Sequence, residues 1–152
     1  MKFSLKPLRK NGLSLAELMV VVLVLLPALL ATVLVFIRCL ELIELSKNTS
    51  LALWEVKNKI NAVETTGFSQ VAATFHQSTF QSANLTGRGV CYVESLQADL
   101  LRVTVSFSWR EKGGRIIGED KDFDGVIDAG EDVNGNGFLD SPVKLVTLIY
   151  DM

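Results

Sequence analysis

The hydrophobic pattern of the chain begins with twenty consecutive positions, residues 18–37, that carry no charge. At about 1.5 Å per residue, a helix of that length spans the ~30 Å hydrocarbon core of a bilayer. From Leu42 to Val63 apolar residues then recur every three or four positions, as on the inner face of a helix. We therefore predict one helix from about Ser14 to Glu64, ended near Gly67, whose second half packs on something outside the membrane.

After residue 89 the hydrophobic period changes from helical spacing to alternation. Apolar residues occupy every second position of 101–109 with polar residues between them, which predicts a half-buried strand. Residues 143–150 are almost continuously apolar and predict a more fully buried strand, and 89–97 predict a third. Residues 68–89 show no period and are expected to be loop with a short helix near 70–75. The expected fold class is α+β: a long N-terminal helix, membrane-spanning in its first half, packed on a small antiparallel sheet.

Composition and charge narrow the function. The 152 residues suit one domain with an appendage, and 15 basic against 17 acidic residues give a net charge of -2, so no nucleic-acid partner is expected. His76 is the single histidine, and no Ser-His-Asp or Cys-His grouping is visible, so we expect no enzyme; an anchored hydrolase is the weakest alternative. The basic residues Lys2, Lys6, Arg9 and Lys10 precede the apolar run and predict a cytoplasmic N-terminus and an extracytoplasmic head.

Glu17 is the unusual residue of the apolar stretch, because a carboxylate at the edge of hydrocarbon needs a cationic partner. The segment around it, KNGLSLAELMVVVLVLL, resembles the class III signal of type IV pilins and pseudopilins. The two strands RVTVSFSWRE and VKLVTLIYD are similar to the C-terminal hairpin of minor members of that family.

This resemblance implies a precursor cut between Gly12 and Leu13 by a prepilin peptidase, with N-methylation of Leu13. The new amine would then meet Glu17 of a neighbouring subunit. Residues 1–12 would be the leader, 13–40 the transmembrane and filament-core helix, and 41–152 the head. The implied protein is a single-pass subunit of the bacterial inner membrane that joins other pilin or pseudopilin subunits in a pilus or secretion pseudopilus.

Eight acidic residues crowd between the last two strands, with Lys121 as the one base among them: Glu119, Asp120, Asp122, Asp124, Asp128, Glu131, Asp132 and Asp140. The segment contains a twelve-residue repeat, DKDFDGVIDAGE followed by DVNGNGFLDSPV. The first copy fits the calcium-loop pattern D-x-[DN]-x-[DN]-G-x5-E in full. Its expected ligands are the side chains of Asp120, Asp122, Asp124, Asp128 and Glu131 and the carbonyl of Val126, which suit the six to eight hard oxygens that Ca²⁺ takes.

The second copy offers Asp132, Asn134, Asn136, the carbonyl of Phe138 and Asp140, but Val143 stands where the closing glutamate belongs. We therefore expect this copy to bind calcium more weakly. The repeats resemble EF-hand loops and tandem calcium repeats, although predicted strands flank them instead of helices. Calcium is expected to fold the insertion, residues 119–142, with Ile127 directed into a small core.

Two questions stay open at this stage. Cys39 and Cys91 either pair or remain separate small apolar residues. The protein is either a filament subunit or a membrane-anchored calcium-binding module that does not enter filaments, in which case Glu17 is incidental.

Overall fold

A computed structural model describes residues 14–151 of the chain. Its elements in order are α1 (Leu15–Glu64), α2 (Phe68–Phe75), β1 (Ser78–Gln81), β2 (Gly87–Gln97), β3 (Leu100–Arg110), β4 (Ile116–Ile117) and β5 (Lys144–Tyr150). The chain divides into two compact units, Met1–Leu42 and Ile43–Met152, and α1 contributes to both.

The described part of the first unit is the apolar half of α1. Its side chains are exposed throughout residues 15–42. The backbone N–H of Glu17 donates to Ser14 Oγ at 3.3 Å, which is the hydrogen bond of a helix N-cap. α1 is long enough and apolar enough to cross a membrane, with a mean hydropathy of 3.1 over its most apolar window. The predicted cleavage position, Gly12 and Leu13, lies outside the described residues.

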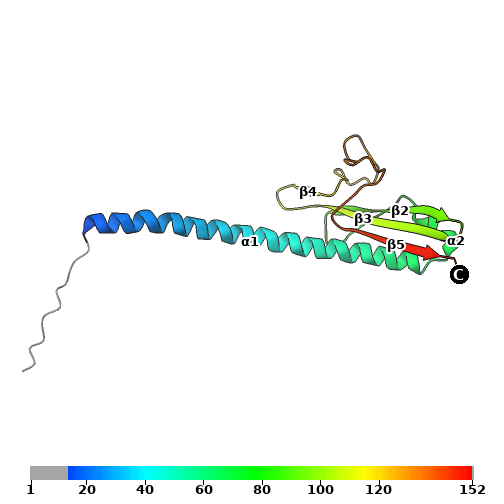
Figure 1. Ribbon diagram of the computed structural model, residues 1–152, viewed down its shortest axis with the longest axis horizontal. Helices are drawn as coiled ribbons and strands as arrows, with labels where there is room; N and C mark the ends of the chain where they lie inside the picture. Colours follow the sequence, from blue (N-terminus) through cyan, green and yellow to red (C-terminus); the bar gives the residue numbers. More distant parts are fainter. Residues whose placement is uncertain (1–13, 152) are drawn as a thin grey trace, which may run out of the picture. The chain divides into compact units, whose positions relative to one another are not determined.

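The second unit is built on an antiparallel sheet with β3 at its centre (Figure 1). β2 pairs along one edge of β3, with Cys91 opposite Val105. β4 and β5 both pair with the other edge, β5 opposite residues 100–106 and β4 opposite residues 109–110. The long helix followed by a small antiparallel sheet confirms the predicted α+β fold class.

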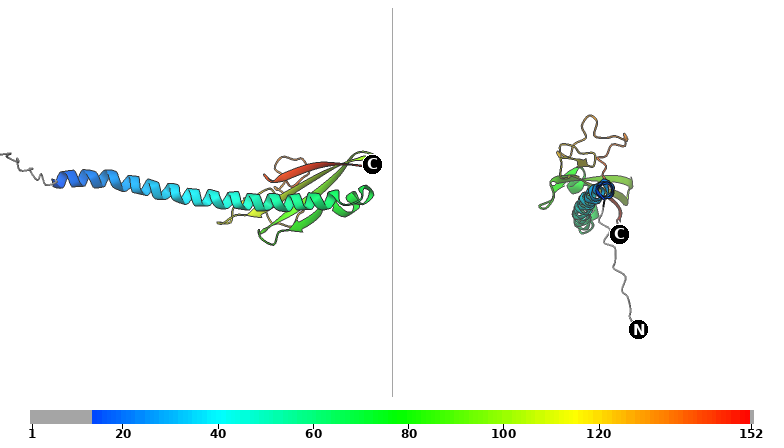
Figure 2. Two further views of the ribbon diagram at one scale, coloured as in Figure 1. Left: turned by 90° about the horizontal axis from the view of Figure 1, so that it is seen from below. Right: turned by 90° about the vertical axis from the view of Figure 1, so that its left-hand side faces the viewer.

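The main core lies between the sheet and the last turns of α1, which cross one face of the sheet (Figure 2). Ala52, Val56, Ile60 and Val63 of α1 are each at most 8% exposed. The alternating apolar residues of β3, from Leu101 to Trp109, are equally buried on the facing side. Both hydrophobic periods predicted from the sequence are thus confirmed: the apolar residues of α1 and those of β3 face each other across one core.

The prediction for residues 68–89, a loop with one short helix, is wrong in one respect, because this segment also contains strand β1. Phe80 of β1 packs on the core beside Phe107, with ring centroids 5.7 Å apart. Gly89 of β2 lies directly under the Phe80 ring, and a Cβ at that position would stand 2.1 Å from the ring. A short strand with one buried aromatic carries too few alternating positions to be found by period alone.

Two burial expectations are also wrong. β5 is an edge strand with one open face, and Val146, Leu148 and Tyr150 are each at least half exposed. The polar side of β3 is instead covered, since Thr104, Ser106 and Ser108 are at most 8% exposed. The cause of this second difference is the insertion between β4 and β5, which packs over that side.

Candidate metal centre

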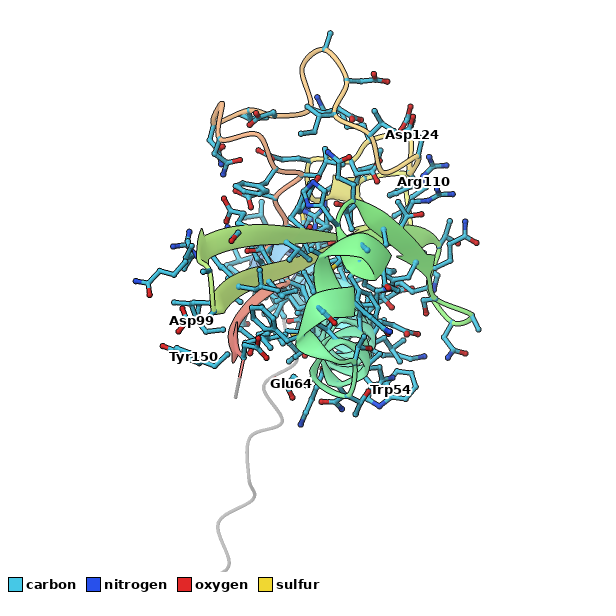
Figure 3. All side chains as sticks on the ribbon, turned by 90° about the vertical axis from the view of Figure 1, so that its right-hand side faces the viewer. Trp54, Glu64, Asp99, Arg110, Asp124 and Tyr150 are labelled. Carbon is cyan, nitrogen blue, oxygen red and sulfur yellow. The ribbon has the colours of Figure 1, made fainter. Side chains whose placement is uncertain are left out.

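The insertion lies on the face of the sheet opposite α1 (Figure 3). Leu139, only 1% exposed, forms a small second core with Val90 and Tyr92. Its backbone N–H donates to the Tyr92 hydroxyl at 3.1 Å, and its carbonyl accepts from Ser106 Oγ at 2.6 Å. This one residue therefore joins the second repeat to β2 and β3 by apolar and polar contacts together.

The first repeat is held by arginines from the sheet. Arg88 Nη1 donates to the carbonyl of Asp124 at 3.0 Å. The guanidinium of Arg110 lies 5.3 Å from the centroid of the Phe123 ring, within cation–π range. Among residues 14–151, neither arginine forms an ion pair with an aspartate side chain of the loop.

The first loop turns tightly around its own carboxylates. Asp120 Oδ1 accepts from the N–H of Phe123 at 2.7 Å, and Oδ2 accepts from the N–H of Gly125 at 3.2 Å. Gly125 has a φ of 79°, a conformation that side chains disfavour, so glycine at this position permits the turn. As a result, one ligand oxygen each from Asp120, Asp122 and Asp124 comes within 4.8 Å of the others.

Glu131 closes the loop from its last position. Its Oε1 accepts from the N–H of Lys121 at 2.7 Å and its Oε2 from the N–H of Asp128 at 3.3 Å. Glu131 is 4% exposed and Asp120 is 1% exposed. Among residues 14–151, neither carboxylate forms an ion pair. Two buried carboxylates without a cationic side chain form a site whose charge an added cation would balance.

The electrostatics of Asp120 show the same imbalance. The pKa of its carboxyl is raised from 3.8 to about 6, mainly by burial and also by the charges of Glu131 and Asp122, against the opposing backbone hydrogen bonds from Phe123 and Gly125. A divalent cation bound at these oxygens would favour the ionised form instead.

The oxygens that the sequence assigned to the first site are therefore partly assembled. The structure brings Asp120, Asp122 and Asp124 together, and it places Glu131 against the same loop through backbone contacts. The side chain of Asp128 is exposed, and the contact of this residue with Glu131 is made by its backbone N–H. Val126 donates its N–H to Asp124 Oδ1 at 2.6 Å. Carbonyl ligation by Val126 stays a prediction.

The second loop repeats the hydrogen bonds of the first. Asp132 Oδ2 accepts from the N–H of Gly137 at 2.8 Å, as Asp120 does from Gly125. Asn134 Oδ1 accepts from the N–H of Asn136 at 3.1 Å, and Asn136 Oδ1 accepts from the N–H of Phe138 at 2.8 Å. The amide nitrogens of both asparagines donate to Asp140 Oδ2 at 2.9 Å. The side chains of Asp132, Asn134, Asn136 and Asp140 thus all form hydrogen bonds within this loop.

Sequence reasoning assigned no role to Glu119. Its Oε1 accepts from the N–H of Val133 at 3.2 Å and its Oε2 from the N–H of Asp140 at 2.8 Å. Its own N–H donates to the carbonyl of Asp140 at 2.8 Å, which closes the neck of the insertion. The available signal was the spacing, because Glu119 precedes Glu131 by one repeat of twelve residues.

Three smaller expectations also have outcomes. Ile127 is 39% exposed, so the expectation that it points into a small core is wrong, and Leu139 holds the equivalent place in the second copy. Cys39 and Cys91 are both free thiols. His76 is exposed, and its Nδ1 accepts from the N–H of Val93 at 3.3 Å.

The sequence matches no protein-family model and no curated protein, and no solved structure matches the chain. The fold, the apolar helix and the loop geometry therefore carry the functional argument. Within residues 14–151 they establish an α+β fold with one helix that could span a membrane and with three aspartates that could hold a metal ion.

Proposed function

We propose that this chain is a minor type IV pilin or pseudopilin, a structural subunit that a prepilin peptidase processes and that assembles with other subunits into a pilus or a secretion pseudopilus. The observation that carries the proposal is the division of α1. Its first half is apolar and exposed, with Glu17 in the first turn, and one face of its second half is buried against an antiparallel sheet. A helix of this kind serves both as membrane anchor and as a surface for packing against like helices.

Glu17 gives the proposed assembly its register. A carboxylate within apolar surroundings is costly unless a positive charge compensates it. In the proposed filament, the amino group of Leu13 in a neighbouring subunit supplies that charge after cleavage. A misplaced subunit would leave Glu17 unpaired, so the pair selects one axial position for each subunit that joins.

Calcium is the proposed ion of the first loop. The donor set fits, because all its side-chain donors are carboxylate oxygens and two of the carboxylates are buried without a cation. Asp120, Asp122, Asp124, Asp128, Glu131 and the Val126 carbonyl would hold the ion. Bound calcium would offset the repulsion among the carboxylates, and the loop would stay closed over β2 and β3. The head would then keep a fixed surface for neighbouring subunits.

The second candidate is a membrane-anchored calcium-binding module that stays outside filaments. The N-cap of α1 favours it, because Ser14 followed three residues later by Glu17 is the pattern of a capping box. A capping glutamate has a local role and needs no neighbouring subunit. The two candidates differ in whether the charge of Glu17 matters, since glutamine also serves in a capping box.

Glu17→Gln therefore separates the two functions. We expect the Glu17→Gln protein to reach the membrane and to lose residues 1–12, but to be nearly absent from sheared filaments or from cross-linked pseudopilus. The matched control is Glu41→Gln, which changes an exposed carboxylate further along the same helix. Incorporation of the Glu17→Gln protein at the wild-type level would contradict the assembly role and favour the anchored module.

A further inference from the structure

Strand β5 pairs with β3 along one edge, and among the described residues no strand pairs with its other edge. The N–H of Phe107 donates to the carbonyl of Val143, and in the same register the N–H of Asp151 donates to the carbonyl of Asp99. Because hydrogen-bonded and non-hydrogen-bonded pairs alternate along an antiparallel ladder, the odd-numbered residues of β5 bind β3. The backbone N–H and C=O groups that point to the open edge therefore belong to the even-numbered residues Lys144, Val146, Leu148 and Tyr150.

Three of these even-numbered residues also have exposed apolar side chains. Val146, Leu148 and Tyr150 are 55%, 50% and 59% exposed. Val146 lies opposite Thr104 of β3, so this apolar row is on the face of the sheet that carries the insertion, away from α1. A strand added at the open edge would satisfy the free backbone groups and cover part of this row at the same time.

β5 lacks the features that usually prevent an edge strand from pairing. Natural edge strands are often short, or they contain charges, prolines or bulges. β5 has seven residues in regular register with β3, and its only charged residue is Lys144 at its start. By contrast, β1 at the opposite edge of the sheet has only four residues. The long, largely uncharged edge of β5 is therefore suited to strand addition.

The end of this edge is acidic. Asp151 directly follows β5, and its N–H donates to the carbonyl of Asp99 at 3.0 Å, so two exposed carboxylates lie at that end, where Figure 3 shows Asp99 beside Tyr150. Glu64 of α1 is also near β5, since its Oε1 accepts from Thr147 Oγ1 at 3.3 Å. A partner strand would gain from a cation that lies at this end.

The two basic residues on and beside β5 are already paired. Lys144 Nζ lies 2.8 Å from Asp140 Oδ1. Arg102 of β3, opposite Leu148, lies 3.5 Å from Glu94. The start of β5 therefore attracts charged groups less strongly than its acidic end does.

We propose that the open edge of β5 binds an extended segment of a different subunit as an additional antiparallel strand. The backbone groups of the edge require an extended partner, and the exposed row favours apolar side chains on one of its faces. Antiparallel pairing is the more stable arrangement per residue. Because the N-terminal end of an antiparallel partner lies beside the C-terminal end of β5, the partner has its cation near its own N-terminus.

The choice of a different subunit over a second copy rests on the proposed function. Two β5 strands paired antiparallel are related by a two-fold axis, which points the two heads in opposite directions. Subunits that join one filament from one membrane point in the same direction. In the proposed filament, therefore, β5 of one copy cannot pair with β5 of another.

Binding of a synthetic peptide to the full chain in detergent tests the strand addition. The probe is Lys-Thr-Val-Thr-Val-Thr-Gln, acetylated and amidated so that its ends are uncharged, with a fluorophore on a spacer. The matched control is Gln-Thr-Val-Thr-Val-Thr-Lys, which has the same composition and the lysine at the other end. By fluorescence anisotropy, we expect the Kd of the probe to be about fivefold lower than that of the control.

Leu148→Pro is the variant that blocks the edge. It removes one N–H that points outward and leaves the bonds of the odd-numbered residues to β3 in place, since proline is tolerated where the N–H of an edge strand faces solvent. We expect this variant to bind the probe about tenfold more weakly. Leu148→Thr keeps the N–H and should lose less. The melting temperature of each variant reports whether the head is folded.

The charged end is tested separately, by a variant that leaves β5 unchanged. Asp99 and Asp151 are both exposed, so the double substitution Asp99→Asn and Asp151→Asn should leave the head folded. We expect the double variant to bind the probe and the control peptide with nearly equal Kd values. A preference that persists undiminished in this variant would contradict the assigned position of the cation.

The other outcomes contradict the inference in distinct ways. Equal binding of the probe to the wild type and to folded Leu148→Pro would show that the edge does not bind it, and absence of binding at millimolar concentration would show the same. A preference for the control peptide would overturn the antiparallel direction. Dimerisation of the wild type that Leu148→Pro abolishes would make a second copy the occupant. None of these results involves Glu17, so the assembly role proposed for it would stand.

Discussion

At the scale of single residues, the insertion depends on two carboxylates that would repel each other without a cation. Asp120 and Glu131 are both almost fully buried, and their ionised forms lack a basic partner among the described residues. Burial and the neighbouring charges of Glu131 and Asp122 raise the pKa of Asp120 to about 6. In the metal-free head, Asp120 must either be protonated or stay ionised at a cost in free energy of folding.

The stability of the metal-free protein should therefore fall as pH rises from about 4 to about 6. In this window the folded state binds the Asp120 proton and the unfolded state has released it, so raising the pH favours unfolding. We expect the stability of the Asp120→Asn protein in EGTA to fall less steeply as pH rises, because asparagine has no proton to lose. The measurement is the melting temperature of the full chain in detergent, followed by tryptophan fluorescence.

Saturating calcium is the second arm of that experiment. Calcium takes the place of the proton, so the wild-type melting temperature should rise above its EGTA value, and the rise should be larger at pH 7 than at pH 5. Parallel pH curves for the wild type and Asp120→Asn in EGTA would show that Asp120 does not carry the effect.

The contacts of the first loop could largely be predicted because a loop of this pattern determines its geometry locally. Asp120, Asp122, Asp124 and Glu131 contact backbone groups within ten residues of themselves, so their spacing is visible in the sequence. Glu119 escaped prediction because its partners, Val133 and Asp140, lie 14 and 21 residues away. Only the folded neck of the insertion brings them together.

At the scale of elements, the sheet has two covered faces. α1 covers one, as the hydrophobic periods predicted, and the insertion covers part of the other. No pattern within β3 predicts the second cover, because the buried Thr104, Ser106 and Ser108 are polar and look solvent-facing. Likewise β5 reads as a buried strand, but nothing in the second unit covers its outer face, and Val146, Leu148 and Tyr150 stay exposed.

The two copies of the repeat allow the packing of the insertion on the sheet to be tested by comparing equivalent residues. Leu139 and Ile127 hold the same position in their loops, but Leu139 is 1% exposed and Ile127 is 39% exposed. We expect Leu139→Ala to lower the free energy of unfolding by about 2–3 kcal/mol in saturating calcium, because it removes the apolar contact with Val90 and Tyr92. Ile127→Ala should lower it by less than about 1 kcal/mol.

Denaturant unfolding of the two variants side by side gives this difference. Equal losses for Leu139→Ala and Ile127→Ala would mean that the insertion does not pack on the sheet through its second loop. A loss for Leu139→Ala that disappears in EGTA would instead indicate that the insertion leaves the sheet when calcium is removed.

At the scale of the whole molecule, each of the two units suits a different environment. The first presents an apolar helix whose side chains are all exposed, which water does not favour and a bilayer or a bundle of like helices does. The second has its own core and an acidic insertion in which three aspartates could hold a metal ion. The proposal of a membrane anchor accounts for the apolar first unit only. The proposal of a filament subunit accounts for the apolar first unit and for the position of Glu17.

The mature N-terminus decides between these explanations most directly. Intact-mass and N-terminal peptide analysis of the protein purified from its native membrane should find a chain that begins at Leu13 and carries one added methyl group on its amine. A native protein that retains residues 1–12 and begins at Met1 would contradict the filament proposal, because Glu17 would then have no freed amine to pair with.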